Sequence, residues 1–138
     1  MRNVRLLTAG MVFFWALGPV TADQGFDNEK IRESAQRTAA ACGIPLQASI
    51  DWKTFRSADL EKYSASSYCD WPLFKLYWSC QKPEKKAAAA QKIKRVVCRF
   101  GGPGKRALSI RDGTMEYVVD WTSGNDDDFG EKWLKANL

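Results

Sequence analysis

Histidine is absent from this 138-residue chain. It is the usual base beside serine and cysteine nucleophiles and the commonest metal ligand, so its absence excludes Ser-His and Cys-His catalytic pairs. The phosphate-loop and dinucleotide-binding glycine motifs are missing as well. We therefore predict no cofactor, no metal and no catalytic residue, and a binding protein is favoured over an enzyme.

Long hydrophobic runs are scarce, and the longest covers residues 6–17. It is too short for a membrane-spanning helix, which needs about 20 residues. Arg2 and Arg5 precede this run, Pro19 breaks the apolar pattern just after it, and small residues follow up to Ala22. This pattern predicts a secretory signal peptide at 1–22, cut after Ala22. Residues 23–138 are then expected to form one periplasmic or secreted domain without a transmembrane segment.

The excess of positive over negative charge is also small. Without Arg2 and Arg5, 19 Lys and Arg face 16 Asp and Glu, a net charge of +3. That small excess gives no reason to expect nucleic acid as a partner. The cations gather mainly on the helix expected at 84–94 and just before it, at Lys82, Lys85, Lys86 and Lys92. Such a face could meet an acidic protein, a glycan or an anionic membrane, although a merely solubilising face is slightly favoured.

Cysteine is limited to four residues, Cys42, Cys69, Cys80 and Cys98. An even number in an exported chain predicts two disulfides. Cys69 and Cys80 flank a helix expected at 70–79, which would hold them about 16 Å apart, too far to bond. Excluding that pair also excludes Cys42–Cys98. Of the two pairings left, we prefer Cys42–Cys69 with Cys80–Cys98.

The most regular pattern, at residues 96–121, predicts three antiparallel strands. Asp112 and Gly113 stand between two alternating apolar segments, as in a two-residue type I′ hairpin turn. With both in the turn, Arg111 lies opposite Thr114. One face of the hairpin and the residues after it then carries Leu108, Ile110, Met115, Tyr117, Val119 and Trp121.

Helices are expected around this sheet. Apolar spacing and capping residues place them at 27–41, 57–63, 70–79, 84–94 and 125–137. Residues 46–52 alternate and would add a fourth strand. The predicted fold is α+β: a small three- to four-stranded antiparallel sheet, about five helices mostly on its apolar face, and two disulfides.

Aromatic residues at helical spacing form a second stripe on the helix at 70–79. Trp71, Phe74 and Trp78 make up this stripe. Burial is the favoured interpretation, since most such stripes face a core. The alternative is an exposed patch that meets a partner.

A glycine-rich basic loop joins two of the expected strands. It contains Gly101, Gly102, Gly104, Lys105 and Arg106. Its backbone amides could hold an anion, but the phosphate-loop spacing is absent and a plain connection between strands is favoured. In a binding protein, this loop is our candidate contact with the partner.

Acidic residues give weaker signals. Asp126, Asp127 and Asp128 lack the alternate spacing of a calcium loop and suit the start of a helix better. Glu116 and Asp120 would lie about 13 Å apart on one strand, too far for a glycosidase pair. We expect them to be solvated.

The function that these observations favour is a small, exported, disulfide-bonded binding module. Its partner would be another exported or envelope protein, with an inhibitor or an immunity-type protein as examples. A structural envelope protein without a discrete ligand is the alternative, and a carboxylate-dependent hydrolase ranks last. The oligomeric state stays open.

Overall fold

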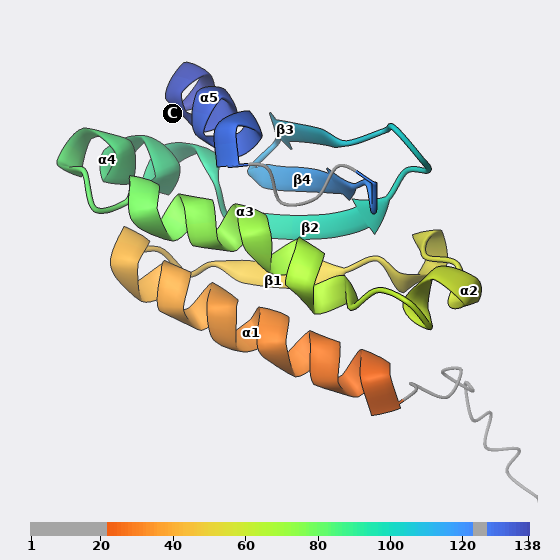
Figure 1. Cartoon of the computed structure of the whole chain (residues 1–138). Coiled ribbons are helices and arrows are strands. Elements are labelled where there is room, and N and C mark those ends of the chain that lie inside the picture. The colour runs from red at the N-terminus through yellow and green to blue at the C-terminus, as the bar shows by residue number, and fades with distance from the viewer. Residues whose placement is uncertain (1–21, 123–126) are drawn as a thin grey trace, which may run out of the picture.

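A four-stranded sheet packs against helices within residues 22–122 and 127–138, which the computed structural model describes (Figure 1). The helices are α1 (Ala22–Cys42), α2 (Ser57–Leu60), α3 (Ala65–Ser79), α4 (Pro83–Lys92) and α5 (Asp127–Asn137), with a 3₁₀ turn, η1, at Trp52–Thr54. The strands are β1 (Gln47–Ile50), β2 (Arg95–Phe100), β3 (Ala107–Arg111) and β4 (Thr114–Val119). The α+β class and the two disulfides are confirmed.

The sheet is mixed and mostly parallel, so the prediction of a purely antiparallel sheet was wrong. Its order is β1-β2-β4-β3, with β1–β2 and β2–β4 parallel and only β3–β4 antiparallel. Alternate residues of β4 are fully buried, whereas most of β3 is exposed. The more apolar strand therefore takes the inner position, and the polar strand forms the edge.

The β3–β4 hairpin has the predicted register. Arg111 pairs with Thr114 and Leu108 pairs with Tyr117. Asp112 has a φ of 50° and Gly113 a φ of 77°, the left-handed values that a type I′ turn requires. The predicted face carries Met115, Tyr117 and Val119 into the core. Trp121, just beyond β4, is buried with them.

Helices α1 and α3 cover this apolar face and run in the same direction (Figure 1). One stripe of α1 is buried, formed by Ile31, Ala35, Thr38 and Cys42. The Thr38 hydroxyl donates a hydrogen bond of 3.1 Å to the backbone carbonyl of Leu73 in α3. This contact fixes how the two helices align along their length.

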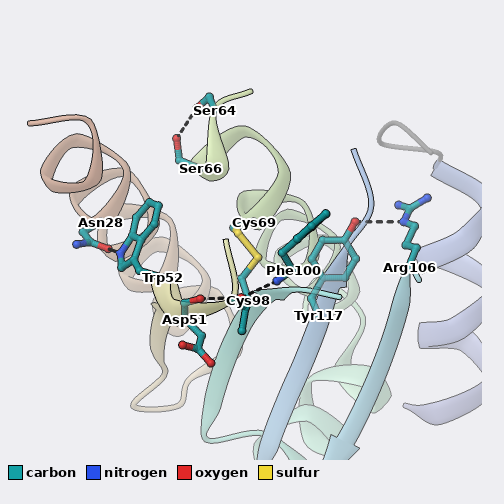
Figure 2. Close-up of a disulfide and its surroundings, with 11 residues drawn as sticks. Asn28, Asp51, Trp52, Ser64, Ser66, Cys69, Cys98, Phe100, Arg106 and Tyr117 are labelled. Atoms are coloured by element: carbon teal, nitrogen blue, oxygen red, sulfur yellow. Dashed lines mark hydrogen bonds between the residues drawn. A yellow bond between two sulfur atoms is a disulfide. The ribbon is translucent and has the colours of Figure 1, made fainter. Parts of the chain in front are cut away.

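That alignment explains the disulfides, which are Cys42–Cys80 and Cys69–Cys98. Because the carboxyl ends of α1 and α3 lie together, Cys42 meets Cys80, with Cα atoms 5.0 Å apart. Cys69 lies eleven residues before Cys80, about three turns earlier on α3, and bonds to Cys98 in β2, as Figure 2 shows. Excluding Cys69–Cys80 was correct, but the preferred pairing of Cys42–Cys69 with Cys80–Cys98 was wrong.

Two helices begin earlier than expected. Helix α1 starts at Ala22 and not at residue 27, and α3 starts at Ala65 and not at residue 70. Residues 1–21 of the predicted signal peptide, and residues 125 and 126 of the helix expected at 125–137, lie outside the described residues. Within the described part, no helix has the length and apolar character to cross a membrane.

Candidate functional site

The aromatic stripe of α3 divides between core and surface. Trp71 is buried, whereas Phe74 is 49% exposed and Trp78 is 57% exposed. The favoured interpretation of burial was therefore correct for Trp71 and wrong for the other two. Residues Cys69, Leu73 and Leu76 occupy the side of α3 that meets α1 and the sheet, which leaves Phe74 and Trp78 on the outer side.

The two exposed rings support each other. The ring centroids of Phe74 and Trp78 lie 6.2 Å apart in an edge-to-face arrangement, and Tyr77 packs edge-on against Trp78 at 5.5 Å. The rings are therefore held in place before any ligand arrives. Two fixed aromatic surfaces on an otherwise well-packed helix are typical of a contact site.

A shallow hollow of about 330 Å³ lies beside Trp78. It is lined by Lys75, Trp78, Ser79, Lys82, Lys85, Glu131, Leu134 and Lys135. The Lys135 ammonium binds Glu131 at 2.9 Å and lowers the pKa of that carboxyl. With four lysines and one glutamate, the hollow is positively charged. We call the hollow and the two rings the α3 patch: Phe74, Lys75, Trp78, Lys82, Lys85 and Lys135.

Helix α4 brings part of the predicted basic face to this patch. Lys85 donates a hydrogen bond to the carbonyl of Lys135, and Lys92 donates to that of Asn137. Cations at the carboxyl end of α5 also suit the dipole of that helix. Thus two separate signals in the sequence, the aromatic stripe and the lysines at 82–85, come together on one surface.

The glycine-rich loop divides in a different way. Gly101, Gly104 and Lys105 are exposed and Gly102 is partly exposed, so they stay candidates for partner contact. The Arg106 guanidinium instead lies against the chain's own aromatic rings.

Two rings and a hydroxyl hold Arg106 in place. Its guanidinium carbon is 4.6 Å from the ring centroid of Trp71 and 4.5 Å from that of Phe129. Its Nε donates a hydrogen bond of 3.1 Å to the Tyr117 hydroxyl (Figure 2). Burial raises the pKa of Tyr117, and the nearby Arg106 partly opposes that effect. No local sequence pattern indicates this arrangement, because Trp71 and Phe129 are distant from Arg106 along the chain.

The acidic candidates do not form a pair. Glu116 faces Arg99 at 3.9 Å on the sheet. Asp120 is only 3% exposed, and its Oδ1 accepts hydrogen bonds from the backbone N–H and the hydroxyl of Thr122. The expectation of solvation was therefore wrong for Asp120, which lies beyond the end of β4. The side chains of Asp126, Asp127 and Asp128 lie outside the described residues.

A larger cleft, of about 580 Å³, opens between the start of α1 and the segment around α2. Its lining includes Phe26, Asp27, Trp52, Tyr63 and Ser64. Sequence reasoning missed this cleft, because no local pattern brings Asp27 together with Trp52 and Tyr63. The five residues come from segments whose arrangement only the fold determines.

No group of three His, Cys, Asp or Glu side chains that could hold a metal is found in the part of the chain that the structure describes. Comparison with protein-family models, with curated proteins and with solved structures found no match to this chain.

Proposed function

We propose that this chain is an exported binding module that recognises an acidic surface on another exported protein through the α3 patch. The single observation that carries the proposal is the exposure of Phe74 and Trp78 side by side next to a lysine-lined hollow. The role is binding, without catalysis.

The aromatic pair would supply most of the binding energy. Residues that dominate protein interfaces are enriched in Trp and Tyr, and they are surrounded by polar contacts that exclude water. Trp78 is such a ring, held in place by its neighbours and next to a hollow that a partner side chain could fill. Covering Phe74 and Trp78 would also remove two exposed apolar surfaces from water.

The lysines define the chemistry of the partner. Lys75, Lys82 and Lys135 line the hollow together with Lys85, so the complementary surface carries Asp or Glu side chains. An anionic membrane would also attract these lysines, but a flat bilayer does not need a hollow. The concave shape beside Trp78 therefore favours a protein whose acidic side chain enters it.

Two disulfides are consistent with an oxidising compartment. A rigid, disulfide-bonded module of this size suits an inhibitor or an immunity-type protein, which binds its target without changing shape much. The proposed site of action is the periplasm or the space outside the cell.

The test is capture of the partner followed by measurement of its affinity. The oxidised protein would be immobilised, exposed to periplasmic and culture extracts, and washed at moderate salt. The retained partner would then be titrated against single variants. We expect Trp78→Ala to weaken binding by about 30-fold, the loss typical of an interface hot spot. We expect Lys82→Glu to slow association, with the largest effect at low salt.

Two matched controls separate the α3 patch from general surface effects. Phe26→Ala removes another exposed aromatic ring, on α1, and Lys105→Glu reverses an exposed charge in the glycine-rich loop. Neither should change the affinity. If Lys105→Glu abolishes binding and Trp78→Ala does not, the contact is the loop. If the chain sediments with anionic vesicles through Trp78 and retains no protein, the partner is a membrane, and the proposal is wrong.

A further inference from the structure

The cleft between α1 and α2 contains a buried carboxylate. Asp27 is only 6% exposed, although it lines the cleft. Its Oδ1 accepts a hydrogen bond of 3.2 Å from the Ser64 hydroxyl. Within the described residues, no lysine or arginine forms an ion pair with it. A buried charge is normally paired, because desolvation without a counter-charge is costly.

Aromatic rings line the same cleft as this carboxylate. The Trp52 indole N–H donates a hydrogen bond of 2.9 Å to the side chain of Asn28, next to Asp27 in sequence (Figure 2). One face of Tyr63 stacks on Trp121, with centroids 5.0 Å apart and planes 9° apart. Because Tyr63 is still 36% exposed and lines the cleft, its remaining surface is available to a ligand.

The charges of the lining also favour a cation. Of the described residues that line the cleft, Asp27 and Glu61 are acidic and Lys62 alone is basic. The Phe26 ring already has the ammonium of Lys30 at 5.4 Å from its centroid. Trp52 and Tyr63 are therefore the aromatic surfaces left for another cation.

From this arrangement we infer that the cleft binds a small organic ammonium group, with Asp27 as its counter-charge and Trp52 and Tyr63 as its aromatic walls. Aromatic faces attract cations through their quadrupole, and the attraction grows where water is excluded. A buried carboxylate adds a charge-assisted contact. The ammonium could come from a quaternary headgroup such as choline or from the side chain of a lysine.

The first experiment needs no variant. Choline, its neutral isostere 3,3-dimethylbutan-1-ol and N-acetyl-lysine methylamide would each be titrated into the oxidised protein, with the Trp52 indole N–H followed by NMR. Choline should give a saturable shift, and the neutral alcohol should bind at least about tenfold more weakly. The ratio between choline and the lysine derivative distinguishes the two sources of the ammonium. Equal binding of choline and the alcohol, or no saturable shift with either ammonium compound, overturns the inference.

The second experiment removes the charge alone. Asp27→Asn keeps the size of the side chain and an oxygen that can accept the Ser64 hydrogen bond, and it should weaken ammonium binding by about tenfold or more. Glu84→Gln, the same change at an exposed site on α4, should have no effect. If Asp27→Asn binds as the unaltered protein does, the inference is wrong. If it does not fold, the comparison of choline with the alcohol decides.

This site is independent of the proposed function. Trp78→Ala should leave choline binding unchanged, so the α3 patch and the cleft can fail separately.

Discussion

At the scale of single residues, Trp71 of α3 packs against both the sheet and α5. Its ring centroid lies 5.3 Å from that of Tyr117 in β4 and 6.1 Å from that of Phe129 in α5. Arg106 lies over the same ring, and Gly130 of α5 is close to its edge. The ring therefore connects α3 to α5 and to the sheet, and it has little freedom to move.

Gly130 tests this packing. A Cβ built at this position would lie 2.0 Å from Cη2 of Trp71, so the ring or α5 would have to shift. We expect Gly130→Ala to lower the free energy of unfolding by about 1–3 kcal/mol, the usual cost of overpacking, despite the better helix propensity of alanine. Gly25→Ala in α1 is the control, because its Cβ would meet nothing within 4 Å. That variant should be neutral or up to about 1 kcal/mol more stable in urea unfolding.

Tyr117 is expected to make the free energy of unfolding depend on pH in the alkaline range. Its pKa in the folded state is raised, mainly by burial, above the ordinary value near 10. Below about pH 10 the neutral tyrosine contributes its whole stabilisation. As the pH rises through the folded pKa that contribution is lost, because the phenol ionises in the unfolded state first. We expect the advantage of the unaltered protein over Tyr117→Phe to shrink between about pH 9 and 11 in urea unfolding. A difference independent of pH would contradict this account.

At the scale of elements, the buried face of each hairpin strand was predictable from the sequence, whereas the order of the strands in the sheet was not. The alternation around Asp112 and Gly113 determines which hairpin residues are buried, and the register followed from it. The same alternation of apolar and polar residues would fit any order of the strands in the sheet, so it does not predict that order. The insertion of β4 between β2 and β3 depends on which strand is more apolar and on the helical connection between β1 and β2.

The candidate site was predictable only in its parts. The stripe of Phe74 and Trp78 and the lysines at 82 and 85 can each be read from local spacing. Whether the stripe is buried depends on which side of α3 meets α1 and the sheet. Local sequence patterns do not determine that side. The adjacent position of α5, which adds Leu134 and Lys135 to the hollow, is a property of the fold.

Both disulfides connect separate elements, so removing one should cost substantial stability. Cys69–Cys98 joins α3 to β2 across a sequence separation of 29 residues. The double variant Cys69→Ala with Cys98→Ala should lose about 3–4 kcal/mol in urea unfolding, as loop-closure entropy suggests. Peptide mapping of this variant should recover Cys42 joined to Cys80. If Cys42 and Cys80 were instead recovered as free thiols, the assigned pairing would be contradicted.

At the scale of the whole molecule, α3 connects the two proposed sites. Ser64 borders the cleft just before the helix begins, and Trp78 belongs to the α3 patch near its carboxyl end. Fourteen residues of helix separate them by about 21 Å. The α3 patch is thus built largely on this buried helix, and the cleft lies next to its amino end. At this distance, a small ammonium ligand and a protein partner can bind together.

The two disulfides interlace along the chain, since the first cysteine pairs with the third and the second with the fourth. A chain that crosses a membrane amino end first presents Cys42 and Cys69 to an oxidase before Cys80 arrives. Joining those two at once would connect the carboxyl end of α1 to the wrong part of α3. Recovery then requires thiolate exchange, which is slow without a catalyst. If the protein is exported as proposed, its production is therefore expected to depend on a disulfide isomerase more than on the supply of oxidant.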